Sequence, residues 1–195
     1  MRSLITKITL VFALLFSFVI PAHAAAETYN FDPMHTYLIW HINHFGFSIQ
    51  AGKFSMIDGT LVVDEAKPQN SKVTVTIPMD KLSTGIPKLD EHLASGDFFN
   101  VEKFPTATFV SNKVVVSGKN TGKVYGILTL LGISKPVTLD VKMLKVGMYP
   151  MKNIKSIGFS ATTEFKRSEF GMDKYLPALA DEVKIDIGVE ANLAK

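Results

Sequence analysis

Three histidines lie close together early in the chain, and histidine is a common metal ligand. On one extended strand, His41 and His44 are an odd number of residues apart and therefore face opposite sides. His35 and His41 share a side but are about 20 Å apart, because a strand rises about 3.3 Å per residue. Zn–N bonds are only about 2.1 Å long. The spacing therefore predicts no metal site, and we expect His35 or His44 to be a hydrogen-bonded structural group near a rim.

The motifs of nucleophilic catalysis are missing from the sequence. The chain has no cysteine, and it contains no G-x-S-x-G, S-x-x-K or H-E-x-x-H pattern. A triad assembled from distant residues leaves no local pattern, so this alternative stays open. On this basis we predict that the protein is not an enzyme and has no catalytic residues.

Asp90, His92 and Asp97 could supply an acid and a base. Asp90 and His92 are two residues apart, however, and side chains at that spacing on a helix point away from each other. A solvated helix face followed by a capping or turn carboxylate is the favoured interpretation.

Arg167 follows an alternating segment at 159–165 and stands where the sheet is expected to end. At the mouth of a cavity, an arginine can bind a phosphate or carbonyl head group. A structural ion pair with Glu169, Asp173 or Asp181 is the more common role for such a residue. Both alternatives remain open from the sequence.

The first 24 residues have the layout of a secretion signal. Arg2 and Lys7 precede an apolar run of 13 residues at 8–20, and the tripeptide Ala-His-Ala follows at 22–24. The run is shorter than the roughly 20 residues that a membrane-spanning helix needs. We therefore expect cleavage after Ala24, export, and one soluble domain at 25–195.

The charge of this domain is nearly balanced. Without Arg2 and Lys7, 19 lysines and arginines face 18 aspartates and glutamates, scattered singly along the chain. Binding to a nucleic acid backbone requires a clustered basic patch, so no nucleic acid partner is expected. The lack of cysteine excludes disulfides and a lipid-modified cysteine, which leaves core packing or strand closure to stabilise the domain.

Apolar residues recur at every second position through most of the domain, which is the period of a β-strand. Turn signals such as Asp58-Gly59 and Lys135-Pro136 separate about eight such segments, so the pattern predicts an all-β antiparallel sandwich or barrel. One stretch, near 85–96, has the three- and four-residue spacing of a short amphipathic helix. The segment 167–177 is expected to be a loop over one end.

The interior of an eight-stranded barrel either fills with side chains or holds one small ligand. Several phenylalanines gather at strand ends and around the expected helix, namely Phe45, Phe47, Phe98, Phe99 and Phe104. They could line a ligand pore or cap a filled core. Composition leaves both alternatives open.

Seven groups of residues, in order along the chain, resemble the YceI-like polyisoprenoid-binding family. They are DPMHT at 32–36, HFG at 44–46 with GKF at 52–54, TG at 84–85, DEHL at 90–93 with DFF at 97–99, FPTATF at 104–109 with Ser111, GILTLLGISKPV at 126–137 and FKRSEFGM at 165–172. Thr36 and Lys166 depart from the usual pattern, and the second departure leaves the partner of Arg167 undetermined.

The resemblance implies an extended, lipocalin-like antiparallel barrel with a helix over one end. Its pore would hold a long isoprenoid or quinone-like lipid, with no other cofactor, and the protein would be periplasmic. The pore lining expected on the same-parity apolar faces is Leu38, Trp40, Ile42, Phe54, Val73, Val75, Ile77, Phe109, Leu128, Leu130, Phe159, Phe165, Ile185 and Ile187. A head group would sit at a rim near Arg167, Asp90 or His92.

These expectations favour binding, transport or storage of a polyisoprenoid lipid, with transient contact to a membrane or a membrane redox protein. The alternative is a filled barrel that acts as an envelope adaptor through its surface. The sequence leaves the choice between monomer and homodimer open.

Overall fold

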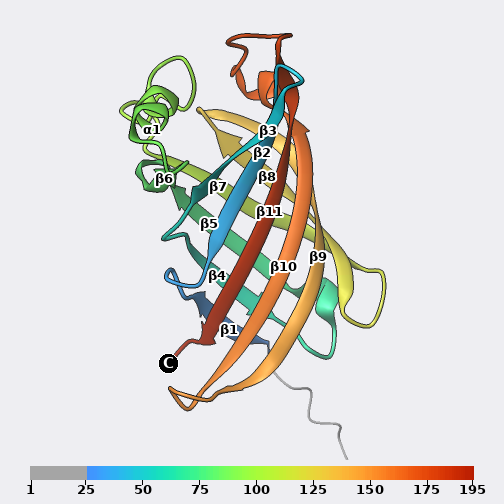
Figure 1. The fold of residues 1–195 in the computed structure, drawn as a ribbon. Helices are drawn as coiled ribbons and strands as arrows, with labels where there is room; N and C mark the ends of the chain where they lie inside the picture. Colours follow the sequence, from blue (N-terminus) through green and yellow to red (C-terminus); the bar gives the residue numbers. More distant parts are fainter. Residues whose placement is uncertain (1–25) are drawn as a thin grey trace, which may run out of the picture.

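The computed structural model describes residues 26–195, so the predicted signal and its cleavage site lie outside the described residues. Long twisted strands wind around a common axis and form most of the molecule (Figure 1). The strands are β1 (Glu27–Phe31), β2 (Tyr37–His44), β3 (Ser48–Phe54), β4 (Asp58–Val63), β5 (Lys72–Pro78), β6 (Leu82–Ser83), β7 (Thr106–Val116), β8 (Thr121–Leu130), β9 (Ile133–Tyr149), β10 (Ile154–Lys166) and β11 (Leu179–Leu193).

Eight of these strands form a closed antiparallel barrel. Neighbouring strands follow the order β1, β4, β5, β7, β8, β9, β10 and β11, and β11 pairs back to β1. The predicted eight-stranded, lipocalin-like barrel is therefore confirmed. Closure gives these strands partners on both sides without the help of disulfides.

β1 and β2 lie one after the other along the same edge of β11, so that together they occupy one strand position in the barrel wall. β11 pairs with β1 through Tyr29 and Leu193, and with β2 through Leu38 and Ile187. In the turn between β1 and β2, the buried hydroxyl of Thr36 donates to the carbonyl of Glu190 on β11 at 3.2 Å. β3 pairs with β2 in a hairpin, and the turn of this hairpin lies near the top of Figure 1.

A short helix, α1 (Pro87–Ala94), lies at the same upper end of the barrel, within the predicted range 85–96 (Figure 1). Proline suits the first turn of a helix because its missing N–H would have no partner there. The helix ends where the N–H and hydroxyl of Ser95 both donate to the carbonyl of His92. Its apolar side, with Leu89 and the buried Leu93, packs against the barrel core.

The segment after β10 also folds over this end, as expected. It contains a single 3-10 turn, η3 (Arg167–Phe170), followed by Gly171 in the left-handed region at φ +77°. Two further 3-10 turns, η1 (Pro68–Asn70) and η2 (Met79–Lys81), flank β5.

At the opposite end of the barrel, side chains of β1, β10 and β11 pack against one another. Tyr29 and Ala191 are fully buried there, and Ile157 on β10 pairs with Ala191. The Tyr29 hydroxyl donates to Glu27 at 2.7 Å, and burial together with this hydrogen bond raises the pKa of Tyr29 to about 12. This packing joins β1, β10 and β11 at that end of the barrel.

Candidate ligand-binding cavity

A cavity of about 920 Å³ runs along the inside of the barrel. Ligand pockets have volumes of about 300–1,000 Å³, so this cavity is at the large end of that range. It is also far larger than the space of a few water molecules, at about 30 Å³ each. The filled interior that the adaptor alternative assumed is therefore wrong.

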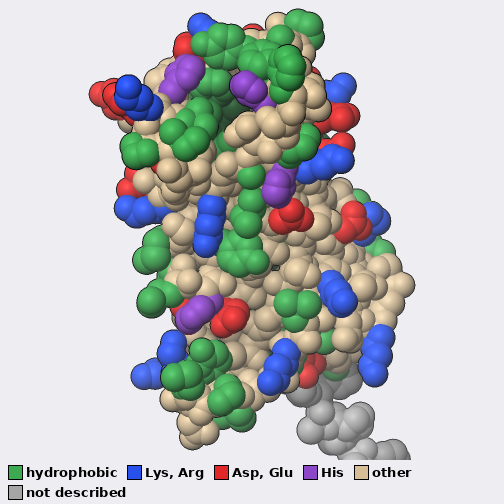
Figure 2. Space-filling model, viewed as in Figure 1, with side chains coloured by type: hydrophobic (Ala, Val, Ile, Leu, Met, Phe, Trp, Pro, Cys, Tyr) green, Lys and Arg blue, Asp and Glu red, His purple; other side chains and the backbone are tan. Residues whose placement is uncertain are grey.

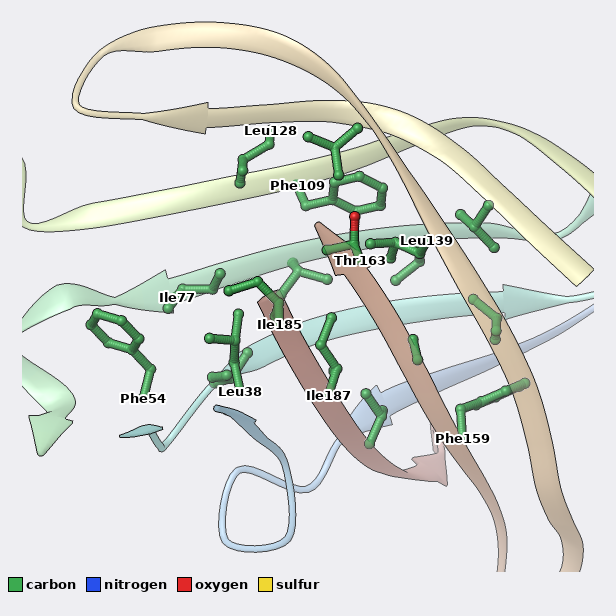
Figure 3. Close-up of a pocket in the computed structure, with 18 of the residues that line it drawn as sticks. Leu38, Phe54, Ile77, Phe109, Leu128, Leu139, Phe159, Thr163, Ile185 and Ile187 are labelled. Carbon is green, nitrogen blue, oxygen red and sulfur yellow. The ribbon is translucent and has the colours of Figure 1, made fainter. Parts of the chain in front are cut away.

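Most of the cavity surface is apolar, and strands all around the barrel contribute to it. Figure 3 shows Phe109 and Leu128 on neighbouring strands, with Ile185 and Ile187 on β11 pointing into the same space. All fourteen residues predicted as pore lining line this cavity: Leu38, Trp40, Ile42, Phe54, Val73, Val75, Ile77, Phe109, Leu128, Leu130, Phe159, Phe165, Ile185 and Ile187. That they bind a ligand stays a prediction.

Strict alternation on the strands positions these side chains. On β5, Val73, Val75 and Ile77 line the cavity, while Thr74 and Thr76 between them are exposed on the outer surface. Successive side chains of a strand point to opposite faces. A two-residue period in the sequence therefore becomes an apolar interior and a polar exterior.

Glycine on a neighbouring strand sets the depth of one aromatic ring. Phe109 on β7 lies against Gly126 on β8, where an added Cβ would come within 2.4 Å of the ring. A side chain at 126 would push the ring into the cavity. The alternating apolar pattern identified Phe109, but the role of Gly126 depends on the register between β7 and β8.

Several cavity residues were not predicted. Leu139 on β9 has the same alternation as the predicted set and could have been found in that way. Thr163 is polar, but its hydroxyl donates to the carbonyl of Thr138 at 2.8 Å, which satisfies its hydrogen-bonding capacity inside the wall. Met172 comes from the loop after η3, where strand alternation gives no signal.

Arg167 is not an exposed rim group, because its side chain is only 2% exposed. Its guanidinium donates to the backbone carbonyls of Ala180, Met172 and Leu179 at 2.9, 2.8 and 3.2 Å. Burial lowers the pKa of Arg167, and the nearby negative charges of Asp181 and Asp173 partly offset this effect. Arg167 thus anchors the loop over the barrel end.

Asp181 supports the same loop from the other side. Its carboxylate accepts the backbone N–H of Ser168 at 2.9 Å and the Ser168 hydroxyl at 2.8 Å. Burial alone would raise the pKa of Asp181, but these hydrogen bonds and the charge of Arg167 outweigh burial and lower it. The predicted carboxylate pairing of Arg167 is therefore a charge interaction, while its hydrogen bonds go to carbonyls.

Asp90 was predicted at the head-group rim, but it has a local structural role. One carboxylate oxygen accepts both the backbone N–H and the hydroxyl of Thr84 at 2.6 Å. These bonds tie the start of α1 to the preceding turn. Among the described residues, the cavity lining does not include Asp90.

His92 does line the cavity, at the end covered by α1. Its Nε2 is 3.4 Å from Asp97, which also contacts Lys174 at 3.2 Å. The hydrogen bond from Lys174, and then that from His92, lower the pKa of Asp97. The His92 ring packs in an edge-to-face geometry against both Phe98 and Tyr175, with ring centroids 5.2 and 6.3 Å apart.

The other three histidines within residues 26–195 lie in different parts of the barrel. His35 contacts Asp32 at 3.1 Å, and His41 contacts Asp186 at 2.9 Å on the outside of the wall. His44 lines the cavity at the upper end. Within residues 26–195, no group of three or more His, Cys, Asp or Glu residues could hold a metal ion.

At the opposite end of β5 and β7, the cavity lining becomes polar, which strand alternation does not predict. The polar residues there are Asp64, Glu65, Ser71, Lys72, Lys119, Asn120 and Thr121. They lie in or beside turns, where alternation ends and a side chain's direction depends on the turn geometry.

A closed antiparallel barrel with a long apolar cavity and a helix at its mouth defines a lipocalin-like binding fold. The chain belongs to the YceI-like domain family, whose family model matches residues 29–191. Over 169 residues it is 37% identical to a UPF0312 protein of Pseudomonas paraeruginosa, covering 86% of this chain and 87% of that one.

Solved structures show the same fold. The YceI protein of Campylobacter jejuni is 32% identical, with a TM-score of 0.68 over 74% of this chain and 85% of that one. A polyisoprenoid binding domain from Saccharophagus degradans has a TM-score of 0.65 at 14% identity, covering 85% of this chain and 98% of that one. Within residues 26–195, none of the helical segments has the length and hydrophobicity of a membrane span.

Proposed function

We propose that this protein binds a polyisoprenoid or isoprenoid-quinone-type lipid in its barrel and carries or stores it in the periplasm. The observation that carries the proposal is the cavity of about 920 Å³ with its apolar lining. A long hydrocarbon chain is unstable in water, because each buried CH₂ contributes about 0.8 kcal/mol. Such a cavity favours a long apolar chain over a polar metabolite.

The size of the cavity suits a chain of intermediate length. If each non-hydrogen atom takes about the 30 Å³ that a water molecule occupies in the liquid, about 30 atoms fit inside. That is about six isoprene units at five carbons each, so a longer chain would extend through a mouth. The polyisoprenoid binding domain of Saccharophagus degradans, which shares the fold, supports this ligand class.

Binding, rather than catalysis, is the role that the lining supports. Of the three predicted head-group residues, His92 and Arg167 line the cavity and Asp90 does not. His92 remains the candidate, because the guanidinium of Arg167 already donates to three backbone carbonyls. The predicted secretion signal supports a periplasmic location. The envelope is also where an exported carrier would meet isoprenoid lipids.

Mass spectrometry of an organic extract tests the proposal. The protein is purified without detergent from cells that express the full chain, and the extract is compared with that of an unrelated exported protein. We expect about one isoprenoid lipid per protein molecule. An extract without any enriched amphiphile, together with no uptake of added ubiquinone or polyprenol by the purified protein, would contradict the proposal.

A further inference from the structure

Exposed aromatic and aliphatic side chains gather at the upper end of the barrel. Phe47 is 91% exposed, and Phe45 and Ile49 beside it are also exposed. Ile86, just before α1, and Tyr175, in the loop after η3, are exposed as well. We call these five residues the apolar rim. Figure 2 shows hydrophobic side chains around a hollow at this end.

The apolar rim is continuous with the cavity. Phe45 and Tyr175 belong both to the exposed surface and to the cavity lining. Backbone contacts place them together, because His44 pairs with Leu179 and the N–H of Leu179 donates to the carbonyl of Tyr175 at 2.9 Å. A lipid that leaves the cavity at this end therefore passes directly onto apolar surface.

The charge distribution around the apolar rim suits docking on a membrane surface without net charge. The β2–β3 hairpin at 43–50 contains no Asp, Glu, Lys or Arg. Close to Tyr175, the positive charge of Lys174 is offset by Asp97 at 3.2 Å. Electrostatic attraction to anionic lipids needs a basic excess, which these segments lack, whereas insertion into the interface needs apolar and aromatic side chains.

We propose that the apolar rim docks on the surface of a lipid bilayer, with Phe47 inserted, so that the ligand passes between membrane and cavity without crossing water. This inference rests on the proposed function for its purpose. The docking surface itself is defined by the hairpin and the two flanking loops. Binding is expected to depend on apolar insertion and hardly on salt or anionic lipid.

Flotation with phosphatidylcholine vesicles tests the inference, using the full mature protein and the variants Phe47→Ser and Met151→Ser. Met151 is 88% exposed in the turn between β9 and β10 at the opposite end, so it is a matched control. We expect wild type and Met151→Ser to float equally at low and high salt. Phe47→Ser should partition about tenfold less, because a phenylalanine loses its buried area in the interface.

Three results would overturn the inference. The first is equal flotation of all three proteins. The second is binding that requires added phosphatidylglycerol and disappears at high salt. The third is a dimer, detected by light scattering and abolished by Phe47→Ser, in a protein that does not bind the vesicles. Ubiquinone uptake from solution, followed through Trp40 fluorescence, separates this inference from the proposed function. If ubiquinone uptake is normal and flotation does not depend on Phe47, only the docking inference is contradicted. If uptake is absent and flotation depends on Phe47, only the proposed lipid-binding function is contradicted.

Discussion

Trp40 on β2 and Gly52 on β3 are direct cross-strand partners, and the indole lies flat across the glycine. A Cβ at position 52 would stand 2.3 Å from Cζ2 of Trp40, closer than any real contact allows. The missing side chain therefore lets the largest ring of the cavity lining lie against the wall. The Trp40 N–H is buried and has no hydrogen-bond partner among the described residues, so packing alone holds this ring.

Gly52→Ala is expected to push the Trp40 indole into the cavity. The reduced space should lower lipid occupancy, and the emission of Trp40 should shift because its surroundings change. As Trp40 is the only tryptophan in the chain, its fluorescence reports on this position alone. Gly96→Ala is the control, since nothing lies within 4 Å of a Cβ there. Unchanged emission and occupancy in Gly52→Ala would contradict the predicted displacement.

Val75→Asp should reduce lipid uptake at least tenfold while the empty protein still folds. The new carboxylate faces the cavity, where water can solvate it until a lipid displaces that water, and burying it costs several kcal/mol. Thr74→Asp, one residue away on the outer face, should bind normally. Ubiquinone titration with Trp40 fluorescence measures both, and equal binding would show that the ligand lies elsewhere.

Arg167→Met should destabilise the fold by about 3 kcal/mol or more. Methionine keeps part of the aliphatic stem but leaves the carbonyls of Met172, Leu179 and Ala180 without their donor. Urea unfolding measures the loss. Lipid affinity per folded molecule should stay close to that of wild type. A stable variant with lost affinity would instead support a head-group role for Arg167.

The Asp181 carboxylate should make part of the stability depend on acid pH. Its pKa is lower in the folded state than in the unfolded chain, so its contribution is present above the unfolded pKa and disappears as pH falls through the folded pKa. Asp181→Asn is therefore expected to be less stable than wild type near pH 7, with the difference shrinking below about pH 4. Urea unfolding across this pH range provides the measurement. A constant difference would assign the effect to lost packing.

Alternation and motif order predicted the barrel, the helix near 85–96 and the fourteen lining residues. Strand period determines which face a residue occupies, and closure then makes one face the interior, so local sequence carries this information. Val75 and Ile187, for example, could be assigned to the cavity without knowing which strands pair.

The ends of the barrel were harder to predict. Whether Arg167 meets carboxylates or carbonyls depends on how the loop at 171–180 returns over it, and this is a three-dimensional property. Asp90 bonds to Thr84 only because the preceding turn brings the two together. The polar lining around Lys72 and Lys119 likewise comes from two turns distant in sequence.

The pairing of Tyr29 with Leu193 joins the first strand to the last residues of the last strand. Contacts between such distant parts of a chain form late and slowly, because a long loop must close first. The wall therefore cannot be sealed before β11 is available, and a nascent chain stays unclosed until this strand has emerged. Removing Asn192 and Leu193, far from the helix-covered mouth, should therefore unseat β1 and open the seam between the first and last strands.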